Sequence, residues 1–242
     1  MLQVCLNGAR KREECRSLPV SPSELAAEAV RAVAAGAEDI HLHPKDAEGL
    51  DSLEPQVVAQ AVTAVRRAVP RGVRIGVTTG AWAVPDPAER AALARAWSVL
   101  PDHASVNWHE DGAEQVAEAL LERGVGVEAG IYSGTEAARR FRASPFTGRV
   151  LRVLAEVTDT KAATADSTAL ALVEELGPVR SAPVLLHGED GGAWPVLRVA
   201  ARLGLDTRVG LEDVLVLPDG SVAADNGALV RAARRLLVVE EE

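Results

Sequence analysis

The chain has 242 residues, of which 48% are hydrophobic, 25% charged and 3% aromatic, and its formal net charge is −9. This composition is typical of a soluble globular protein and excludes disordered, collagen-like and membrane-embedded chains. The acidic balance argues against sequence-independent nucleic-acid binding, which needs a surplus of Lys and Arg. We expect no membrane partner, because no run of about 20 apolar residues is present. We expect a cytoplasmic location, because no secretory signal is visible at the start.

Short apolar runs alternate with helical stretches along the whole chain. The first helix has a capping residue at Ser21, a favourable Pro22 in its first turn and a stop signal at Gly36. The L-P-D-G segment at 217–220 predicts a small hairpin. Strands are expected at 2–6, 38–44, 73–79, 103–108, 124–132, 149–157, 182–188 and 207–213, and helices at 23–35, 54–69, 88–97, 112–123, 135–142, 164–176, 194–203 and 226–239.

Eight strand–helix units predict parallel strands joined by right-handed crossovers. Their number and the chain length favour a (β/α)8 TIM barrel that forms a single domain over residues 1–242. A doubly wound open sheet is the alternative, but it normally has a glycine-rich phosphate turn after its first strand. The corresponding segment here, L-N-G-A-R-K-R-E, has one glycine. In a barrel, catalytic residues lie at the carboxyl ends of the strands.

Polar residues occupy these strand ends throughout the sequence. Asn, Asp and Glu are poor strand formers, so a shared site explains such a ring better than packing does. A barrel rim is also partly solvated, so some of the residues are bystanders. The set consists of Asn7, Arg10, His41, His43, Thr78, Thr79, Asn107, His109, Glu128, Glu156, Asp159, His187, Arg208, Glu212 and Asp213.

His41 and His43 are the strongest metal-binding candidates, because alternate residues of a strand face the same side. The alternative is one hydrogen-bonded core histidine and one exposed histidine. Catalytic zinc normally has three protein ligands, and Glu212 would supply the third because the eighth strand of a closed barrel lies beside the first. Glu212 and Asp213 could instead be an acidic pair at a helix start or on a solvated rim. Arg208 shares a face with Glu212 and would keep a carboxylate ionised or bind a substrate carboxylate.

Six short motifs fall in order along the chain: L-N-G-A-R, H-L-H-P-K-D, T-T-G-A-W, V-N-W, V-E-A-G-I-Y and R-V-G-L-E-D. Together they resemble the β-keto acid cleavage enzymes, which include the 3-keto-5-aminohexanoate cleavage enzyme. The resemblance implies a zinc-dependent barrel that transfers the acyl part of a β-keto acid to CoA from acetyl-CoA and releases acetoacetate. It also implies that His41, His43 and Glu212 are zinc ligands, that Asp213 is the general base and that Arg208 is its charged partner.

The same resemblance implies substrate contacts elsewhere on the rim. Thr78 falls where the family has a hydroxyl residue near the substrate, and Glu128 where it has a carboxylate for the distal group of the substrate. Thr79 and Asn107 are expected to join them, Thr79 as a further hydroxyl donor to a developing oxyanion. His109 or His187 would enter the site as a fourth ligand or an outer contact, or else have a capping or surface role.

CoA carries several negative charges, so an acidic protein needs local positive charge to bind it. Arg10, Lys11 and Arg12 after the first strand, with Lys45 after the second, could provide that charge or form an ordinary solvated loop. Arg10 stands where some family members carry Glu, and Lys45 where many carry Arg. The family resemblance also implies a homo-oligomer such as a tetramer.

Other functions remain open at the level of sequence. A metal-dependent aldolase or hydrolase on the same barrel would turn over its substrate without CoA. A catalytically silent metal-binding homologue would keep the ligands and show no turnover. A pure interaction scaffold would leave the polar ring at the strand ends without an explanation.

Overall fold

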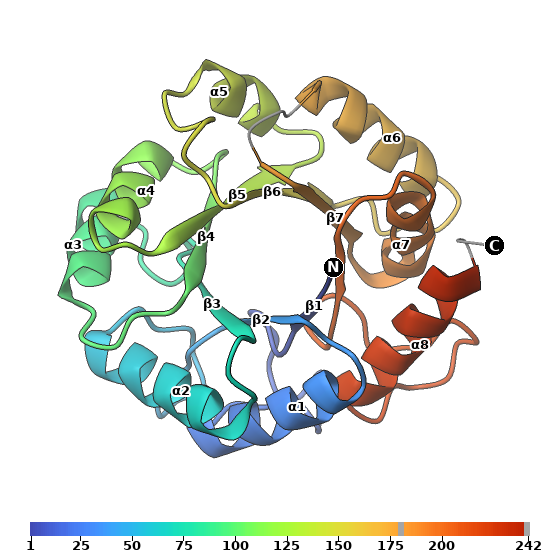
Figure 1. Cartoon of the computed structure of the whole chain (residues 1–242), viewed down its shortest axis with the longest axis horizontal. Coiled ribbons are helices and arrows are strands. Elements are labelled where there is room, and N and C mark those ends of the chain that lie inside the picture. Colours follow the sequence, from blue (N-terminus) through green and yellow to red (C-terminus); the bar gives the residue numbers. More distant parts are fainter. Residues whose placement is uncertain (179–181, 240–242) are drawn as a thin grey trace.

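Eight parallel strands surround a central axis, and eight helices form an outer ring, in the computed structural model that describes residues 1–178 and 182–239 (Figure 1). Hydrogen-bonded neighbours follow the order β7-β6-β5-β4-β3-β2-β1-β8. A parallel bridge between Leu185 and Asp206 joins β7 to the segment that enters β8 and closes the ring. The strands are β1 (Leu2–Cys5), β2 (Asp39–Leu42), β3 (Arg74–Thr78), β4 (His103–Asn107), β5 (Gly126–Tyr132), β6 (Arg152–Val157), β7 (Val184–Gly188) and β8 (Thr207–Val209). The predicted single-domain (β/α)8 barrel is confirmed.

The helices alternate with the strands, as the hydrophobic periodicity predicts. Ser21 caps the first helix in a capping box with Glu24, which satisfies backbone N–H groups at the helix start. None of the described helices is long and apolar enough to cross a membrane. The helices are α1 (Pro22–Ala34), α2 (Pro55–Ala68), α3 (Pro87–Ala96), α4 (Ala113–Glu122), α5 (Ala137–Ala143), α6 (Ala165–Leu176), α7 (Ala193–Arg202) and α8 (Asn226–Val239), with a 3₁₀ turn at Asp190–Gly192.

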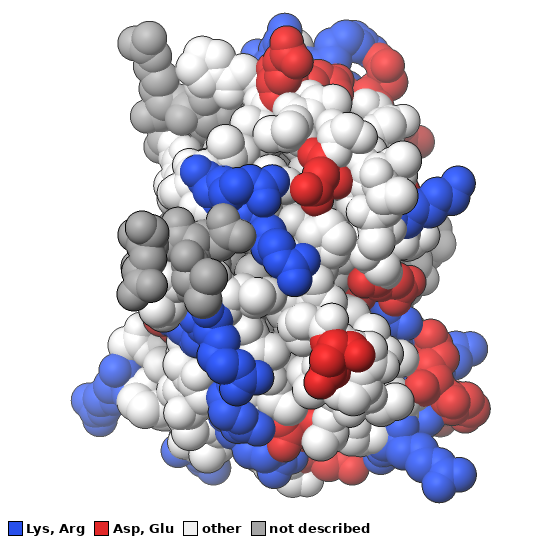
Figure 2. All heavy atoms as spheres, turned by 90° about the vertical axis from the view of Figure 1, so that its right-hand side faces the viewer, with Lys and Arg blue, Asp and Glu red and all other residues white. Residues whose placement is uncertain are grey.

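The segment between β8 and α8 contains the predicted small hairpin. Val216 and Val222 form an antiparallel bridge, and the Gly220 amide donates to the Leu217 carbonyl within the turn. On the face that carries α7 and α8, basic and acidic side chains occur together between uncharged areas (Figure 2). This face therefore presents a mixed surface rather than a field of one sign.

Apolar side chains fill the layer between the strands and the helices, whereas the inside of the barrel is polar. At the amino-terminal end of the strands, Gln3, Asp39, His103, Glu128 and Arg152 are all buried and in mutual contact. This network forms the floor of the barrel beneath the strand ends that hold the site.

Two glycines allow the turn after β8 to pack closely on β1. A Cβ atom on Gly210 would lie 1.8 Å from the Cys5 carbonyl oxygen, so only glycine permits this crossing. Gly8 has φ +59°, and a Cβ atom there would lie 2.4 Å from Cγ of Glu212. The L-N-G and R-V-G-L-E-D motifs thus share a structural reason: they bring Glu212 over the end of β1.

Candidate active site

His41, His43 and Glu212 meet at the carboxyl ends of the strands. His41 belongs to β2, His43 follows that strand, and Glu212 lies in the turn three residues beyond β8. Glu212 Oε2 is 3.8 Å from His41 Nε2, and Glu212 Oε1 is 3.5 Å from His43 Nε2. Both histidines are buried. The structure therefore brings together the three side chains predicted as metal ligands.

The spacing of these atoms fits a shared metal ion. Three ligands bound tetrahedrally to one zinc ion lie about 3.4 Å from one another, from zinc–ligand bonds of about 2.1 Å. Glu212 Oε1 accepts a hydrogen bond from Arg208, whereas Glu212 Oε2 is buried and has no hydrogen-bond partner among the described residues. A buried carboxylate oxygen without a donor is costly unless a cation satisfies it. The donor set of two imidazoles and one carboxylate suits zinc.

The two imidazoles have opposite electrostatic environments. Burial lowers the pKa of His41 to about 3, so this ring is neutral. Burial also acts to lower the pKa of His43, but the carboxylates of Glu212 and Asp51 outweigh it and raise the pKa to about 9. In the metal-free protein the positive charge of the cluster therefore lies on His43, where metal binding would displace a proton.

Asp51 and Trp82 enclose the outer side of His43. Asp51 Oδ2 is 2.6 Å from His43 Nδ1, and Asp51 Oδ1 accepts a hydrogen bond of 2.6 Å from Lys45 Nζ. The Trp82 indole donates to Asp51 at 2.8 Å and stacks on the His43 ring at 5.8 Å between centroids. Asn7 holds the main chain of His43, accepting from its N–H and donating to its carbonyl. His43 is thus fixed at its backbone, one ring edge and one ring face.

Asp213, the residue after Glu212, lies beside Arg208. The Arg208 guanidinium donates to Asp213 Oδ1 and to Glu212 Oε1, both at 2.8 Å. Glu212 was predicted to share a strand face with Arg208, but β8 ends at Val209, and both carboxylates reach the guanidinium from the turn that follows. The Cys5 thiol donates to Asp213 Oδ2 at 2.8 Å. Burial raises the pKa of Asp213 against the opposing effect of Arg208, whereas Arg208 and the histidines hold the pKa of Glu212 well below its usual range. Of two adjacent carboxylates, Asp213 is thus the better proton acceptor.

His187 enters the site, and His109 does not contact it. The Arg208 Nε–H donates to His187 Nδ1 at 3.3 Å, and this nitrogen lies 3.6 Å from Asp213 Oδ1. Burial and Arg208 lower the pKa of His187 to about 4, so the ring is neutral. His109 packs against Tyr132 instead, with ring centroids 4.3 Å apart.

A pair of carboxylates forms the opposite part of the rim. Glu156, at the end of β6, is hydrogen-bonded to Glu189 and to Tyr132, and lies 3.3 Å from His187 Nε2. Burial and the neighbouring Glu156 raise the pKa of Glu189 to about 7, and burial also raises that of Glu156. The pair therefore holds a proton near neutral pH.

Thr78, Thr79 and Asn107, the predicted substrate contacts at the ends of β3 and β4, each form a hydrogen bond within the protein. The Thr78 hydroxyl accepts from the Gly80 amide, and the Thr79 hydroxyl donates to the Ser105 carbonyl at 2.6 Å. Asn107 donates to Glu110 at 2.9 Å. All three side chains are buried. Their roles in substrate binding stay predictions.

Arg10 and Lys45, also predicted to bind substrate or CoA, are tied to acidic neighbours. Arg10 donates to the Glu212 carbonyl at 2.9 Å and forms an ion pair of 2.6 Å with Asp190. This contact fastens the β1–α1 loop to the turn after β8. The Lys45 side chain is 2% exposed and bonded to Asp51. Their positive charges are thus largely balanced within the protein.

Glu128, predicted to contact the distal group of the substrate, lies in the floor network beneath the rim. Gln3, Arg152 and His103 surround its carboxylate at 3.0, 3.0 and 3.1 Å. Burial opposes protonation of His103, but Glu128 and Asp39 raise its pKa to about 9. Asp39, His103 and Glu128 could geometrically hold a metal ion. Their carboxylates are, however, already paired with protein cations, which fits a structural ion network better.

Three further residues belong to this site: Asp51, Trp82 and Glu189. Asp51 and Glu189 lie in loops and carry no sequence signal of their own: Asp51 is eight residues beyond His43, and Glu189 directly follows β7. Trp82 is part of the T-T-G-A-W motif, in which a Cβ atom on Gly80 would lie 2.3 Å from the Trp82 ring. Gly80 therefore makes room for the folded-back indole.

The fold of this chain is similar to several solved structures. The structure of ObcA, solved as a ternary complex with a C4-CoA adduct and oxalate, matches with TM-score 0.72 and 17% identity over 93% of this chain. This chain spans 64% of the ObcA chain. Type I 3-dehydroquinate dehydratase from Clostridium difficile matches with TM-score 0.67 and 11% identity, over 100% of this chain and 92% of that chain. The 3-hexulose-6-phosphate synthase from Salmonella typhimurium matches with TM-score 0.58 and 14% identity, over 99% of both chains.

At these identities the solved structures support the fold alone. A search of curated proteins gives no significant match to the sequence. The family model for β-keto acid cleavage enzymes matches residues 1–239, which is nearly the whole chain. The chain therefore belongs to the β-keto acid cleavage enzyme family.

Proposed function

We propose that the protein is a zinc-dependent acyltransferase that converts a β-keto acid and acetyl-CoA to acetoacetate and an acyl-CoA. The acyl group of the keto acid moves to the CoA sulfur, and the acetyl group moves to the carbon that carries the carboxylate, so the reaction balances without an oxidant or a reductant. The observation that carries the proposal is the cluster of the buried His41 and His43 with the half-buried Glu212, beside Arg208 and Asp213, in a chain of this family.

Each residue of the cluster has a role in the proposed reaction. His41, His43 and Glu212 would hold zinc, which as a Lewis acid polarises a carbonyl oxygen. Asp213 accepts a proton as the general base, and its raised pKa suits this task. Arg208 fixes the Asp213 carboxylate through its hydrogen bond. Across the rim, Thr78 accepts from the Gly80 amide, which leaves its own O–H able to donate to a substrate oxygen.

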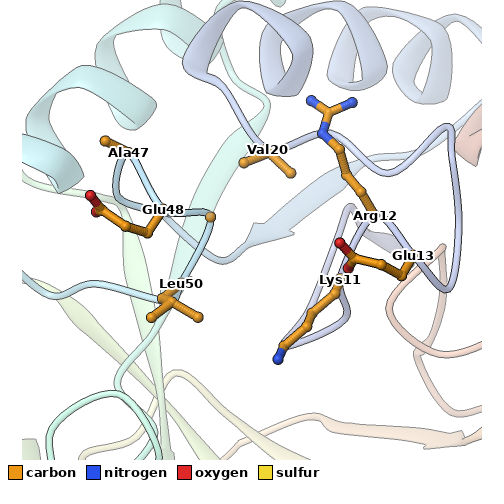
Figure 3. A pocket seen from close by; sticks show the side chains of 8 residues that line it. Lys11, Arg12, Glu13, Val20, Ala47, Glu48 and Leu50 are labelled. Carbon is orange, nitrogen blue, oxygen red and sulfur yellow. The ribbon is translucent and has the colours of Figure 1, made fainter.

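A hollow between the β1–α1 and β2–α2 loops is the proposed entry for CoA. Residues 11–13 of the β1–α1 loop face residues 47–50 of the β2–α2 loop across it (Figure 3). A neighbouring hollow shares Lys11 and Leu50 and is bordered by Asp51 and Trp82, so the two lead to the outer side of His43. Lys11 has no ion-pair partner among the described residues, and the Trp82 side chain is 48% exposed. A free cation and an aromatic surface suit the phosphates and the adenine ring of CoA.

Lys11→Ala is therefore expected to raise the KM for acetyl-CoA by about 3–10-fold, which corresponds to loss of one exposed charge contact of about 1 kcal/mol. The effect should shrink as salt increases, because an exposed ion pair is screened. Initial rates at varied acetyl-CoA and saturating keto acid measure it. Arg71→Ala, at an exposed position between α2 and β3 on the opposite end of the barrel, is the matched control, because Arg71 also has no ion-pair partner among the described residues. An unchanged KM would place CoA elsewhere.

The reaction itself is tested with purified protein, acetyl-CoA and a panel of β-keto acids. We expect acetoacetate and one new CoA thioester in equal amounts, detected by mass spectrometry, and loss of both after zinc chelation. Turnover of a panel member without CoA would instead indicate an aldolase or hydrolase. No turnover of any member by the zinc-loaded protein would contradict the proposal and favour a silent metal-binding homologue.

A further inference from the structure

The carboxylate of Asp51 lies behind His43, on the flank of the ring that faces away from Glu212. Asp51 Oδ2 is 2.6 Å from His43 Nδ1, whereas the other ring nitrogen, Nε2, is 3.5 Å from Glu212 Oε1. We propose that Asp51 is a positioning residue whose carboxylate accepts a hydrogen bond from the Nδ1–H of His43 and so orients the Nε2 lone pair toward the metal. This inference deepens the proposed function and rests on its zinc site.

Asp51 is itself held in a fixed orientation. Lys45 bonds its Oδ1 atom at 2.6 Å, and the Trp82 indole bonds its Oδ2 atom at 2.8 Å. The Asp51 and Lys45 side chains are 4% and 2% exposed, so their charges balance each other away from solvent. Trp82 also stacks on the His43 ring with an interplanar angle of 14°. Two loops, β2–α2 and β3–α3, thus orient one imidazole through one carboxylate.

The other histidine ligand lacks such an anchor. His41 Nδ1 is 4.0 Å from Glu128 Oε2, too far for a hydrogen bond, and it has no hydrogen-bond partner among the residues described. Glu128 Oε2 lies instead 3.1 Å from His103 Nδ1. His43 is therefore the ligand that the fold fixes before a metal arrives, and His41 completes the site. Removing an outer carboxylate of this kind typically costs about 10–100-fold in metal affinity, because it orients the ligand and raises its basicity.

The experiment compares Asp51→Asn with Asp46→Asn. Asp46 is a carboxylate of the same loop that accepts from the Glu48 and Leu50 amides and shapes the loop without touching His43. Zn²⁺ affinity is measured by competition with a chromophoric chelator, and the visible spectrum of the Co²⁺-loaded protein reports the ligand field. We expect Asp51→Asn to weaken Zn²⁺ binding by about 10–100-fold and to shift the Co²⁺ bands. Asp46→Asn should leave both readouts as in the wild type.

Thermal unfolding in the presence of EDTA separates the metal effect from a folding defect. If Asp51→Asn does not fold, Asp51→Glu keeps the negative charge but displaces the carboxylate, and it should also weaken Zn²⁺ binding. Zn²⁺ affinity within threefold of the wild type in the folded Asp51 variant would overturn the inference, as would an equal loss in Asp46→Asn. A wild-type protein that binds no Zn²⁺ would instead refute the zinc site of the proposed function, so the two failures are distinguishable.

Discussion

Asp213→Asn is expected to lower kcat by about 10²–10⁴-fold, the usual contribution of a general base. An amide of the same shape cannot accept the proton, although it can still receive the hydrogen bond that Arg208 donates. The metal ligands are untouched, so zinc content should remain at one ion per chain. Steady-state rates with the best keto acid of the panel, with zinc measured on the same preparation, test this expectation.

A matched control shows whether the effect belongs to the site. Asp159 belongs to the polar strand-end set, but the structure places it in the β6–α6 loop, where it accepts from Thr168 and the Lys161 amide and has no described contact with the three ligands. Asp159→Asn therefore makes the same chemical change outside the cluster. We expect this variant to retain the wild-type kcat. A kcat within threefold of the wild type in Asp213→Asn would contradict the role of Asp213 as the base. The neutral His187, 3.6 Å from Asp213, would then be the next candidate.

The architecture could be predicted because its signals are local. Each strand–helix unit carries its own apolar period, and the expected helix boundaries lie within two residues of the observed ones, as at 54–69 against α2 (Pro55–Ala68). The strand bounds differ more, by three residues at the start of β6 and by four at the end of β8. The sequence predicts the last strand over 207–213, but it ends at Val209 because the chain turns at Gly210 to cross over Cys5. Glu212 reaches the histidines through this turn, not through the strand itself.

The sequence identified the residues of the site more readily than their partners. His41 and His43 could be paired from strand period alone, and Glu212 from closure of the barrel. The partner of Lys45 is Asp51, which lies in a loop whose path no periodicity determines. For the same reason, the sequence could not show that Arg10 binds Asp190 across the barrel rim. Long-range pairing depends on loop conformation, and only the structure provides it.

His41→Ala and His43→Ala are each expected to abolish stoichiometric zinc binding and, with it, activity. Two remaining ligands are fewer than the three that a catalytic zinc site normally requires. Elemental analysis of protein purified alongside the wild type measures the loss. His109→Ala is the control, because this ring packs against Tyr132 and contacts none of the three ligands in the described structure. Unchanged zinc in both ligand variants would refute the site.

Unfolding measurements give the same test without any substrate. A ligand that binds only the folded state stabilises it by RT ln(1 + [L]/Kd), about 2.7 kcal/mol at a free concentration of 100 Kd. Zinc should therefore raise the unfolding temperature of the wild type and of His109→Ala, and leave that of His41→Ala and His43→Ala unchanged.

His103→Ala removes the histidine of the barrel floor, which forms ion pairs with Asp39 and Glu128. It should destabilise the fold yet keep the zinc-dependent shift, because no hydrogen bond joins the floor network to the three proposed zinc ligands in the described structure.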